Sequence, residues 1–279
     1  QNVGVVCGCG IRGIEKTAKG FTFHTKGGDF YATKCIMATG GKTLKKSGSD
    51  GSGFLYLESL GHHIIDLVPG LIGLKGKQSF FADIAGIRAD VKVDLYIEST
   101  HVCSEQGELQ LTNYGISGIP VFQLSRVATR ALSEQKKVYA TLNFVPFWEK
   151  EQCLTYFKER FKKADEKHIG EALIGFFPEK LIPVLLEESH IKAAKYANRL
   201  QTEELESFID TVQGLRVDIT DWNTFDTAQV TAGGVDTDEI NAETMESKLC
   251  PGLYFAGEMV DIDGICGGYN LQWAWSSGA

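Results

Sequence analysis

Two glycine-containing turns late in the sequence carry the residue types that a ligand site needs. In "GLYFAGE" a short apolar strand is predicted to end at Gly257 and Glu258. The glycine lets a ligand approach the backbone, and the carboxylate accepts hydrogen bonds from hydroxyl groups. In "GGYNLQ", Gly267 and Gly268 precede a predicted helix, whose first N–H groups and positive dipole end suit a negative or electron-rich ligand. Together the turns predict a site for a flat, electron-rich ring.

The elements that position such a site begin with β structure. A hairpin is predicted from a strand at Phe21–Thr25 and a turn at Gly27–Gly28. The stretch "KCIMATGG" then predicts a buried strand that ends in a glycine loop. The helix expected after it has Phe54 and Leu57 on one face and ends at Gly61.

A different pattern begins near Leu71. Apolar and polar residues alternate over 91–97 and again over 138–144, and strand character returns at 215–219. Such alternation is typical of an antiparallel sheet with one solvated face. Between the first two strands, "GIPVFQLSRVATRALSEQ" predicts a helix that begins at Pro120.

The segment 147–213 has a helical pattern. Its clearest helix is "TEELESFIDTVQG", which we expect Thr202 to cap and Gly214 to end. The helical segment interrupts the β-rich segment, and no internal repeat or low-complexity linker separates the two.

Composition narrows the class of protein. The 279 residues are 43% hydrophobic and 23% charged, which is typical of a globular domain, and the net charge of -8 argues against nucleic acid or an anionic membrane as the main partner. No apolar run approaches the roughly 20 residues of a membrane span. The first residues do not have the pattern of a signal peptide.

The cysteines are scattered and odd in number. No CxxC pair is present, so we expect no zinc ribbon and no bound metal. Cys7 and Cys9 form either a metal or redox pair or, as we expect, two positions on one face of a strand. Dispersed thiols favour a reducing, cytoplasmic location. The seven positions are Cys7, Cys9, Cys35, Cys103, Cys153, Cys250 and Cys266.

Six spaced stretches together resemble one flavoprotein family. They are "CIMATGG", "GELQLTNYGISGIPVFQLSR", "TAGGV", "TMESK", "GLYFAGEMVDIDG" and "GGYNLQWAWSSG", and they cover nearly the whole chain. The family is that of the BaiN-like, aminoacetone-oxidase-type NAD(P)/FAD-dependent oxidoreductases. More remotely, "AGE" before a glycine-bounded turn is similar to the fumarate reductase class.

The resemblance implies an α/β plus α+β fold in three parts. They are a partial Rossmann-like FAD domain at residues 1–70 and 227–279, a β-rich, barrel-like insert domain at 71–146 and 214–226, and a helical subdomain at 147–213. The order of strand and helix patterns in the sequence is the same. We therefore expect the two segments of the FAD domain to pack together.

The resemblance also indicates a missing part. Such proteins begin with a strand, a GxGxxG turn and a helix that binds the FAD pyrophosphate. Gly8, Gly10 and Gly13 have that spacing, but a hairpin follows, so we interpret "GVVCGCGIRG" as a strand of a small sheet. We expect the chain to be an inactive fragment that is purified without FAD and associates with itself through the surface left bare.

FAD is the expected cofactor, with NAD(P)H as an electron donor and a small molecule as substrate. We name no catalytic residue, because the cofactor itself carries hydride chemistry. Thr231, Gly233 and Gly234 either approach the flavin or form an interdomain turn, and Asp261 and Asp263 either assist or are solvated turn residues. The expected cofactor-binding residues are Ala38, Thr39, Gly40, Gly41, Thr231, Gly233, Gly234, Gly257, Glu258, Asp261, Gly267, Gly268, Tyr269, Asn270 and Leu271.

Four other side chains have two interpretations each. His62 and His63 follow a helix, where the dipole favours a cationic histidine, or they act in catalysis; we expect the structural role. Tyr114 and Ser117 either line a substrate cleft or lie at the start of a helix.

Three function hypotheses remain. The leading one is an FAD-dependent oxidoreductase. The second is a substrate-binding or scaffold module without cofactor chemistry of its own. The third is an RNA-modifying flavoprotein, against which the net charge of -8 and the lack of basic stripes count.

Overall fold

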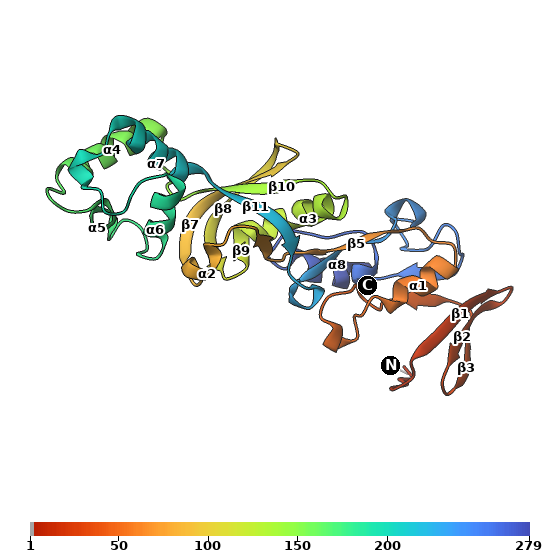
Figure 1. Ribbon diagram of the computed structural model, residues 1–279. Coiled ribbons are helices and arrows are strands. Elements are labelled where there is room, and N and C mark those ends of the chain that lie inside the picture. Colours follow the sequence, from red (N-terminus) through yellow and green to blue (C-terminus); the bar gives the residue numbers. More distant parts are fainter. Residues whose placement is uncertain (1–2) are drawn as a thin grey trace. The chain divides into compact units, whose positions relative to one another are not determined.

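The computed structural model describes residues 3–279 and consists of two compact units. We call Gln1–Gly70 with Thr224–Ala279 the terminal unit, and Leu71–Asn223 the barrel unit. Each unit has a hydrophobic core made only of its own residues. Figure 1 shows the elements of both units.

Six strands of the barrel unit close into a barrel in the order β10-β11-β6-β9-β8-β7 (Figure 1). Their bounds are β6 (Leu74–Gly76), β7 (Arg88–Ile97), β8 (Thr100–Thr112), β9 (Gly115–Gly118), β10 (Val138–Asn143) and β11 (Leu215–Trp222). The strands that the alternation predicted at 91–97, 138–144 and 215–219 are therefore confirmed, and all three belong to this barrel.

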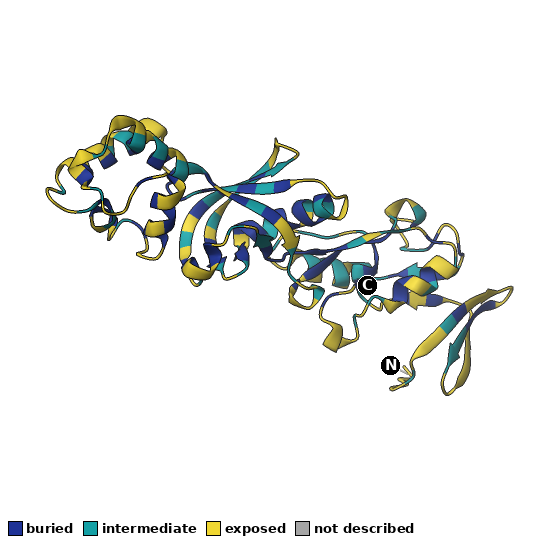
Figure 2. Ribbon diagram, viewed as in Figure 1, coloured by how far each residue is buried: buried dark blue, intermediate teal, exposed yellow. Residues whose placement is uncertain are grey.

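Apolar side chains at alternate positions of the strands fill the interior of the barrel. Ala140 of β10 pairs with Leu95 of β7 on one side and with Val217 of β11 on the other. All three side chains are fully buried, whereas their neighbours along each strand are more accessible (Figure 2). The apolar face of each strand thus points inward and the polar face points to solvent.

Two helices pack on the barrel. Helix α3 (Ile119–Ser133) has Pro120 in its first turn and contacts β7, β8, β9, β10 and β11. Val121, Leu124 and Ala128 lie on its buried face at i, i+3 and i+7. The shorter α2 (Phe81–Ile84) contacts β8. The helix predicted to begin at Pro120 is confirmed.

Four helices lie between β10 and β11 in the sequence. They are α4 (Lys150–Lys162), α5 (Ile169–Leu173), α6 (Leu181–Glu188) and α7 (Thr202–Gly214). Aromatic rings form their centre: Phe157 lies 5.0 Å from Phe176 and 5.4 Å from Phe208, measured between ring centroids. The helices share one continuous core with the barrel strands.

The N-cap of α7 corrects one expectation. Thr202 is the first residue of the helix, and the cap is Gln201, which forms a reciprocal capping box with Glu204. Lys195 binds the Glu204 carboxylate at 2.5 Å. The Gln201 side chain accepts the Glu204 N–H, which is the role we assigned to the threonine hydroxyl. The Gln201 N–H in turn donates to the Glu204 carboxylate. The helix ends at Gly214, as predicted.

In the terminal unit, β1 (Ile11–Thr17), β2 (Gly20–Thr25) and β3 (Gly28–Ala32) form an antiparallel sheet. The hairpin predicted around Gly27–Gly28 is confirmed. The interpretation of "GVVCGCGIRG" as a strand is wrong for its first part, because residues 3–10 form no strand and β1 begins at Ile11. Cys7 and Cys9 consequently do not lie on one face of a strand.

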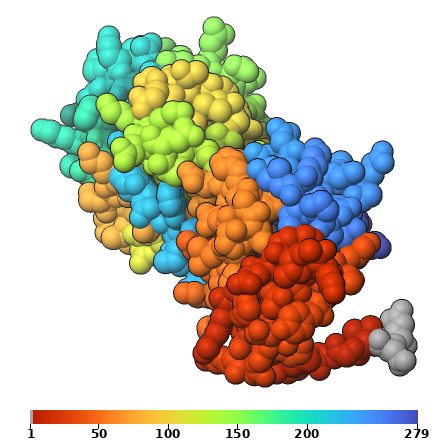
Figure 3. Space-filling model, turned by 90° about the vertical axis from the view of Figure 1, so that its right-hand side faces the viewer, coloured from red at the N-terminus to blue at the C-terminus, as the bar shows by residue number. Residues whose placement is uncertain are grey.

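Two further strand pairs complete this unit. Strand β4 (Cys35–Met37) pairs in parallel with β13 (Leu253–Phe255), and β5 (Ile64–Gly70) pairs antiparallel with β12 (Val230–Val235). Figure 3 shows the red and blue ends of the colour range side by side, as the β4–β13 pairing requires. The sequence did not predict β5 and β12, because neither strand alternates clearly.

Shorter elements connect these strands. Helix α1 (Ser52–Ser59) ends with Gly61 at φ +93, as predicted, and α8 (Tyr269–Ser277) is the last helix of the chain after β13. The single turns of 3₁₀ helix in this unit are η1 (Lys45–Ser47), η3 (Phe225–Thr227), η4 (Thr237–Glu239) and η5 (Gly257–Met259), whereas η2 (Ala197–Arg199) lies in the barrel unit between α6 and α7.

Candidate functional site

The carboxylate of Glu258 joins three segments of the terminal unit. It lies in η5, directly after β13, and its Oε1 accepts the Thr231 N–H of β12 at 2.6 Å. Its Oε2 accepts the Gly41 N–H at 3.2 Å, in the loop after β4. Because β4 and β13 are parallel, both loops leave from the same edge of the sheet. The Glu258 carboxylate therefore connects the loops at the carboxyl ends of β4 and β13 to β12. We call these two contacts the Glu258 bracket.

Burial dominates the electrostatics of this bracket. Burial raises the pKa of the Glu258 carboxyl above its ordinary value, and the charge of Asp263 adds to this effect. The amides of Thr231 and Gly41 act in the opposite direction, because they donate hydrogen bonds to the ionised form. The backbone dipoles thus offset only part of the effect of burial on this carboxyl.

Because Gly41 has no side chain, the loop after β4 can approach both Thr231 of β12 and the Glu258 carboxylate. A Cβ built on it would lie 2.3 Å from Thr231 Oγ1 and 2.8 Å from Glu258 Oε2. The next residue, Lys42, donates its N–H to Thr231 Oγ1 at 2.8 Å. A side chain at position 41 would therefore push apart the loop and β12.

The glycines of β12 are needed for backbone contacts. A Cβ on Gly233 would lie 2.4 Å from the carbonyl oxygen of Asp66, and one on Gly234 would lie 2.6 Å from that of Met259. The Gly233 N–H donates to Asp261 Oδ1 at 3.0 Å. This pair of glycines lies in a buried strand, so the interpretation as a simple turn is wrong.

Two side chains of helix α8 form hydrogen bonds with the backbone of Gly257, the glycine after β13. Ser277 Oγ accepts the Gly257 N–H at 2.8 Å, and Trp273 Nε1 donates to the Gly257 carbonyl oxygen at 3.0 Å. Trp273 and Ser277 were not among the predicted site residues. The sequence signal that would have identified them is their i, i+4 spacing on a helix that follows the glycine turn.

The start of α8 is open. Gly268 is its N-cap in the left-handed conformation, without a side-chain cap, and a Cβ built there would meet no atom within 4 Å. Tyr269 and Leu271 are exposed. Asn270 instead turns back on the chain: its Oδ1 accepts the Gly264 N–H at 2.8 Å and its Nδ2 donates to the Gly264 carbonyl oxygen.

The predicted site residues thus divide into two groups. One group is buried or bonded within the protein and holds the loops together; it comprises Gly41, Thr231, Gly233, Gly234, Gly257, Glu258, Asp261 and Asn270. The other group is accessible at the loop after β4 or at the start of α8, although the Thr39 hydroxyl also donates to Met259 Sδ at 3.2 Å; it comprises Ala38, Thr39, Gly40, Gly267, Gly268, Tyr269 and Leu271. Accessible residues can touch a ligand, and the buried ones fix where those residues lie.

A pocket of about 440 Å³ lies between α1 and β5. Its lining includes Phe54 and Glu58 of α1, and Ile64 of β5. Lys42 also lines it, and the Lys42 ammonium lies 4.8 Å from the centroid of the Phe225 ring. Lys42 was not predicted, although it directly follows the glycine loop of the candidate site.

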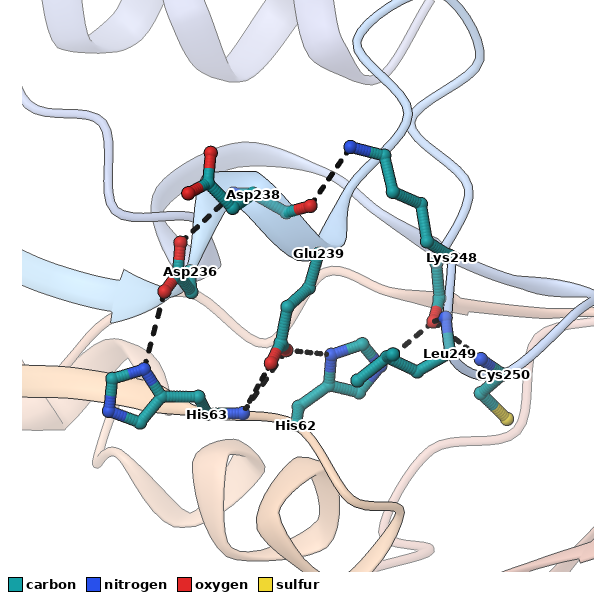
Figure 4. A network of polar contacts seen from close by, with 9 residues as sticks. His62, His63, Asp236, Asp238, Glu239, Lys248, Leu249 and Cys250 are labelled. Carbon is teal, nitrogen blue, oxygen red and sulfur yellow. Dashed lines mark hydrogen bonds and ion pairs between the residues drawn. The ribbon is translucent and has the colours of Figure 1, made fainter.

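His62 lies in a buried polar network (Figure 4). Its Nδ1 lies 2.7 Å from Glu239 Oε2 and its Nε2 lies 2.9 Å from Ser247 Oγ. Ser247 Oγ accepts the N–H groups of Leu249 and Cys250, so its own proton is donated to His62 Nε2. The remaining proton of a neutral imidazole is then on Nδ1 and is donated to Glu239.

This carboxylate–imidazole–hydroxyl series is structural. A nucleophilic serine needs an accessible oxygen with a free lone pair, whereas Ser247 is buried and accepts two amides. The expectation that His62 has a structural role agrees with this, but its cause is the buried network and not the helix dipole. His63 is exposed, with Nδ1 3.3 Å from Asp236 Oδ2.

The two other candidates lie in the barrel unit. Tyr114 is in the turn between β8 and β9, and its hydroxyl would lie 2.6 Å from a Cβ on Gly73. Ser117 is buried in β9, where it pairs with Gln110. Ser117 therefore belongs to the barrel wall just before α3.

Within residues 3–279, no group of three or more histidine, cysteine, aspartate or glutamate side chains is arranged to hold a metal ion. None of the helices described there has both the length and the apolar character needed to cross a lipid bilayer.

Known enzymes are similar to this chain along nearly its whole length. It is 43% identical over 278 residues to the 3-dehydro-bile acid delta(4,6)-reductase of Clostridium scindens, a match that covers 100% of this chain and 68% of that protein. It is 28% identical to the ribosomal RNA dihydrouridine synthases of Escherichia coli and Haemophilus influenzae, over 96% and 92% of the chain. These two matches cover 64% and 61% of those proteins.

A family model described as HI0933-like protein Rossmann domain matches residues 1–279. The match extends over both units, including the barrel and its helices. The resemblance inferred from the six sequence stretches is thereby confirmed. The chain belongs to the HI0933-like Rossmann-domain family.

Proposed function

We propose that the chain is part of an FAD-dependent oxidoreductase and contacts the flavin and ribityl portions of FAD from the terminal unit. The observation that carries the proposal is the Glu258 bracket, which fixes two glycine loops at the carboxyl ends of parallel strands. In α/β folds, ligands bind outside the carboxyl ends of the strands. The reductase at 43% identity supports oxidoreductase chemistry.

The residues present fit the ring side of the cofactor. The N-terminus of α8 offers N–H groups next to open space at Gly268, and Thr39 is accessible after β4. Glu258 acts as a positioning residue, because both of its oxygens already accept backbone amides. When bound, FAD supplies hydride-transfer chemistry, and these residues orient it.

The pyrophosphate side fits less well. Gly8 and Gly10 lead into β1, so in the described residues no helix follows this glycine spacing. We therefore propose weak FAD binding by this chain, because the usual anchor is a glycine turn backed by a helix N-terminus. NAD(P)H as the electron donor is part of the same proposal.

For the substrate, we propose a small molecule with a carbon–carbon double bond that gains two hydrogens. The names of both kinds of relative, a delta(4,6)-reductase and the dihydrouridine synthases, denote such an addition. The higher identity to the bile acid reductase favours a small apolar acid over RNA, and so does the net charge of -8.

An RNA uridine substrate is the second candidate. Two relatives named for ribosomal RNA match more than nine-tenths of this chain, which is the observation that favours it. Reduction assays with a steroid acid and with a uridine-containing RNA, followed through NAD(P)H consumption by the flavin-loaded protein, separate the two substrates.

Titration with FAD tests the cofactor proposal. Gly268→Ala and Gly61→Ala form a matched pair, because both glycines have φ +93 and open space around them. We expect a measurable affinity that Gly268→Ala weakens at least tenfold and Gly61→Ala leaves near the native value. An equal effect of both changes would remove α8 from the site, and no flavin binding at all would favour a scaffold role.

A further inference from the structure

Cys7 and Cys9 lie in a segment that the strand interpretation does not explain. Residues 3–10 form no strand, Cys7 is exposed and Cys9 is half-buried. Both are free thiols separated only by Gly8. Both thiols are therefore available for redox chemistry outside a strand.

The segment has room to change conformation. A Cβ built on Gly4, Gly8 or Gly10 would meet no atom within 4 Å. In Figure 3 the stretch next to the grey terminal residues projects from the neighbouring atoms. The glycines of this stretch are therefore free of close contacts.

The backbone between the two cysteines is already bent. Gly8 has φ +67, a left-handed conformation that glycine adopts without steric cost. Residues i and i+2 lie at most about 7.6 Å apart between Cα atoms, as two 3.8 Å steps require. A bend brings this distance toward the roughly 4.4–6.8 Å of disulfides. The bend at Gly8 therefore favours a bond between its two neighbours.

The thiols in the cores are much less reactive. Burial raises the pKa of Cys35 to about 11 and also raises that of Cys153 and Cys250. Little thiolate forms there near neutral pH, and thiolate is the reactive species. Burial raises the pKa of Cys103 as well.

We infer that Cys7 and Cys9 form a reversible dithiol–disulfide pair that exchanges with low-molecular-weight disulfides. The Cys7 thiolate attacks one sulfur of glutathione disulfide, forms a mixed disulfide and releases one glutathione thiolate. The Cys9 thiolate then attacks the Cys7 sulfur, closes the ring and releases the second glutathione thiolate. The protein dithiol loses two electrons and two protons, and one glutathione disulfide becomes two thiols.

Closing this ring stiffens the chain where it enters β1. The ring ends two residues before Ile11, whose carbonyl oxygen accepts the hydroxyl proton of Tyr56 at 2.6 Å. Tyr56 belongs to α1, so this contact connects the redox pair to the helix that lines the 440 Å³ pocket.

Peptide mapping of the full chain tests the inference. Trypsin cleaves after Arg12, and residues 1–11 contain no arginine or lysine, so Cys7 and Cys9 lie together in the tryptic peptide that ends at Arg12, with no other cysteine in residues 1–12. After equilibration with glutathione disulfide and quenching of free thiols, we expect this peptide to have lost two hydrogens. Excess dithiothreitol should restore the dithiol.

Substitutions separate the two steps. Cys9→Ser should trap one glutathione on Cys7, because ring closure is impossible. Gly8→Val should accumulate the mixed disulfide, since valine disfavours the left-handed bend, whereas Gly10→Val should close the ring like the native chain. The inference is wrong if native peptide 1–12 stays a dithiol or carries only glutathione adducts while the glutathione couple is fully oxidising.

Discussion

The two units are stabilised in different ways. The barrel unit has one continuous apolar core, in which alternating strand residues meet the aromatic rings of α4 and α7. The terminal unit has a smaller core and connects its loops through single polar groups, such as the Glu258 carboxylate and the His62 ring. Stability in the first unit comes mainly from buried area, and geometry in the second depends on individual hydrogen bonds.

The difference also separates rigidity from accessibility. Large side chains of the terminal unit remain exposed, including Leu271 and Trp275 of α8 and Ile36 of β4. In β4 the flanking Cys35 and Met37 are buried, so only one face of the β4–β13 pair is covered by this unit's core. A unit with bare apolar residues next to fixed glycine loops is suited to binding.

Removing a central ring should give the largest effect. Phe157→Ala in the barrel unit should cost about 3–5 kcal/mol of unfolding free energy, since it opens a cavity among five neighbouring rings. Phe255→Ala tests the smaller core. Hydrogen exchange should show lost protection mainly in the unit that carries each change; equal loss in both units would contradict the comparison.

Gly41→Ala should have the next largest effect. The added methyl group clashes with Thr231 and Glu258, and overpacking of this kind costs about 1–3 kcal/mol. Gly27→Ala is the control, because its nearest neighbour would be 3.9 Å away. Urea denaturation should give a lower midpoint for Gly41→Ala than for Gly27→Ala. Equal midpoints would mean that the loop and β12 move apart at little cost in stability.

Two glutamates should show opposite pH dependence. The folded-state pKa of Glu258 is raised above 4.5 by burial, so its contribution to stability is greatest below that pH and is lost as pH rises through the folded value. The pKa of Glu204 is lowered by Lys195, so its contribution is present above 4.5 and is lost as pH falls.

Thermal unfolding between acid and neutral pH measures both effects. Glu258→Gln should cost about 1–2 kcal/mol through the weakened bracket. The destabilisation that Glu204→Gln causes should shrink toward acid pH, whereas the destabilisation that Glu258→Gln causes should shrink toward neutral pH. If the two variants followed the native protein with the same pH dependence, the burial argument would be refuted.

The smallest effect concerns two faces of α8. Trp273→Phe removes the bond to the Gly257 carbonyl oxygen and should cost about 1 kcal/mol. Trp275→Phe alters a side chain that is 70% exposed and should change stability by less than about 0.5 kcal/mol. We also propose that this exposed face promotes self-association, so Trp275→Ala should lower the sedimenting mass at high concentration. An unchanged mass distribution would exclude that role.

How far the sequence predicted the structure differs between the units. Alternation at 91–97 and 138–144 identified barrel strands, because one face of each strand must be apolar. In the terminal unit, motifs marked the loops, but the all-buried β12 and the mixed β5 lack periodicity and were missed.

The candidate site was predictable in position and less so in role. Sequence motifs pointed to Gly41, Thr231 and Glu258, and the structure joins all three. The partner of Glu258 was not predictable, because a motif does not show whether a carboxylate meets a ligand or two backbone amides. The prediction of the α7 cap was wrong for a similar reason: Gln201 and Thr202 are adjacent, and only the backbone angles decide which of them is the N-cap.

The parallel pairing of β4 with β13 also has a consequence for biosynthesis. Cys35 pairs with Leu253, and the entire barrel unit is encoded between them. On the ribosome, the barrel strands and their helices emerge with all of their partners before β13 is translated. Closing so long a loop is slow and entropically costly, so the β4–β13 pair forms after the barrel. The terminal unit is thereby completed last, and β4 is a segment that chaperones can protect during synthesis.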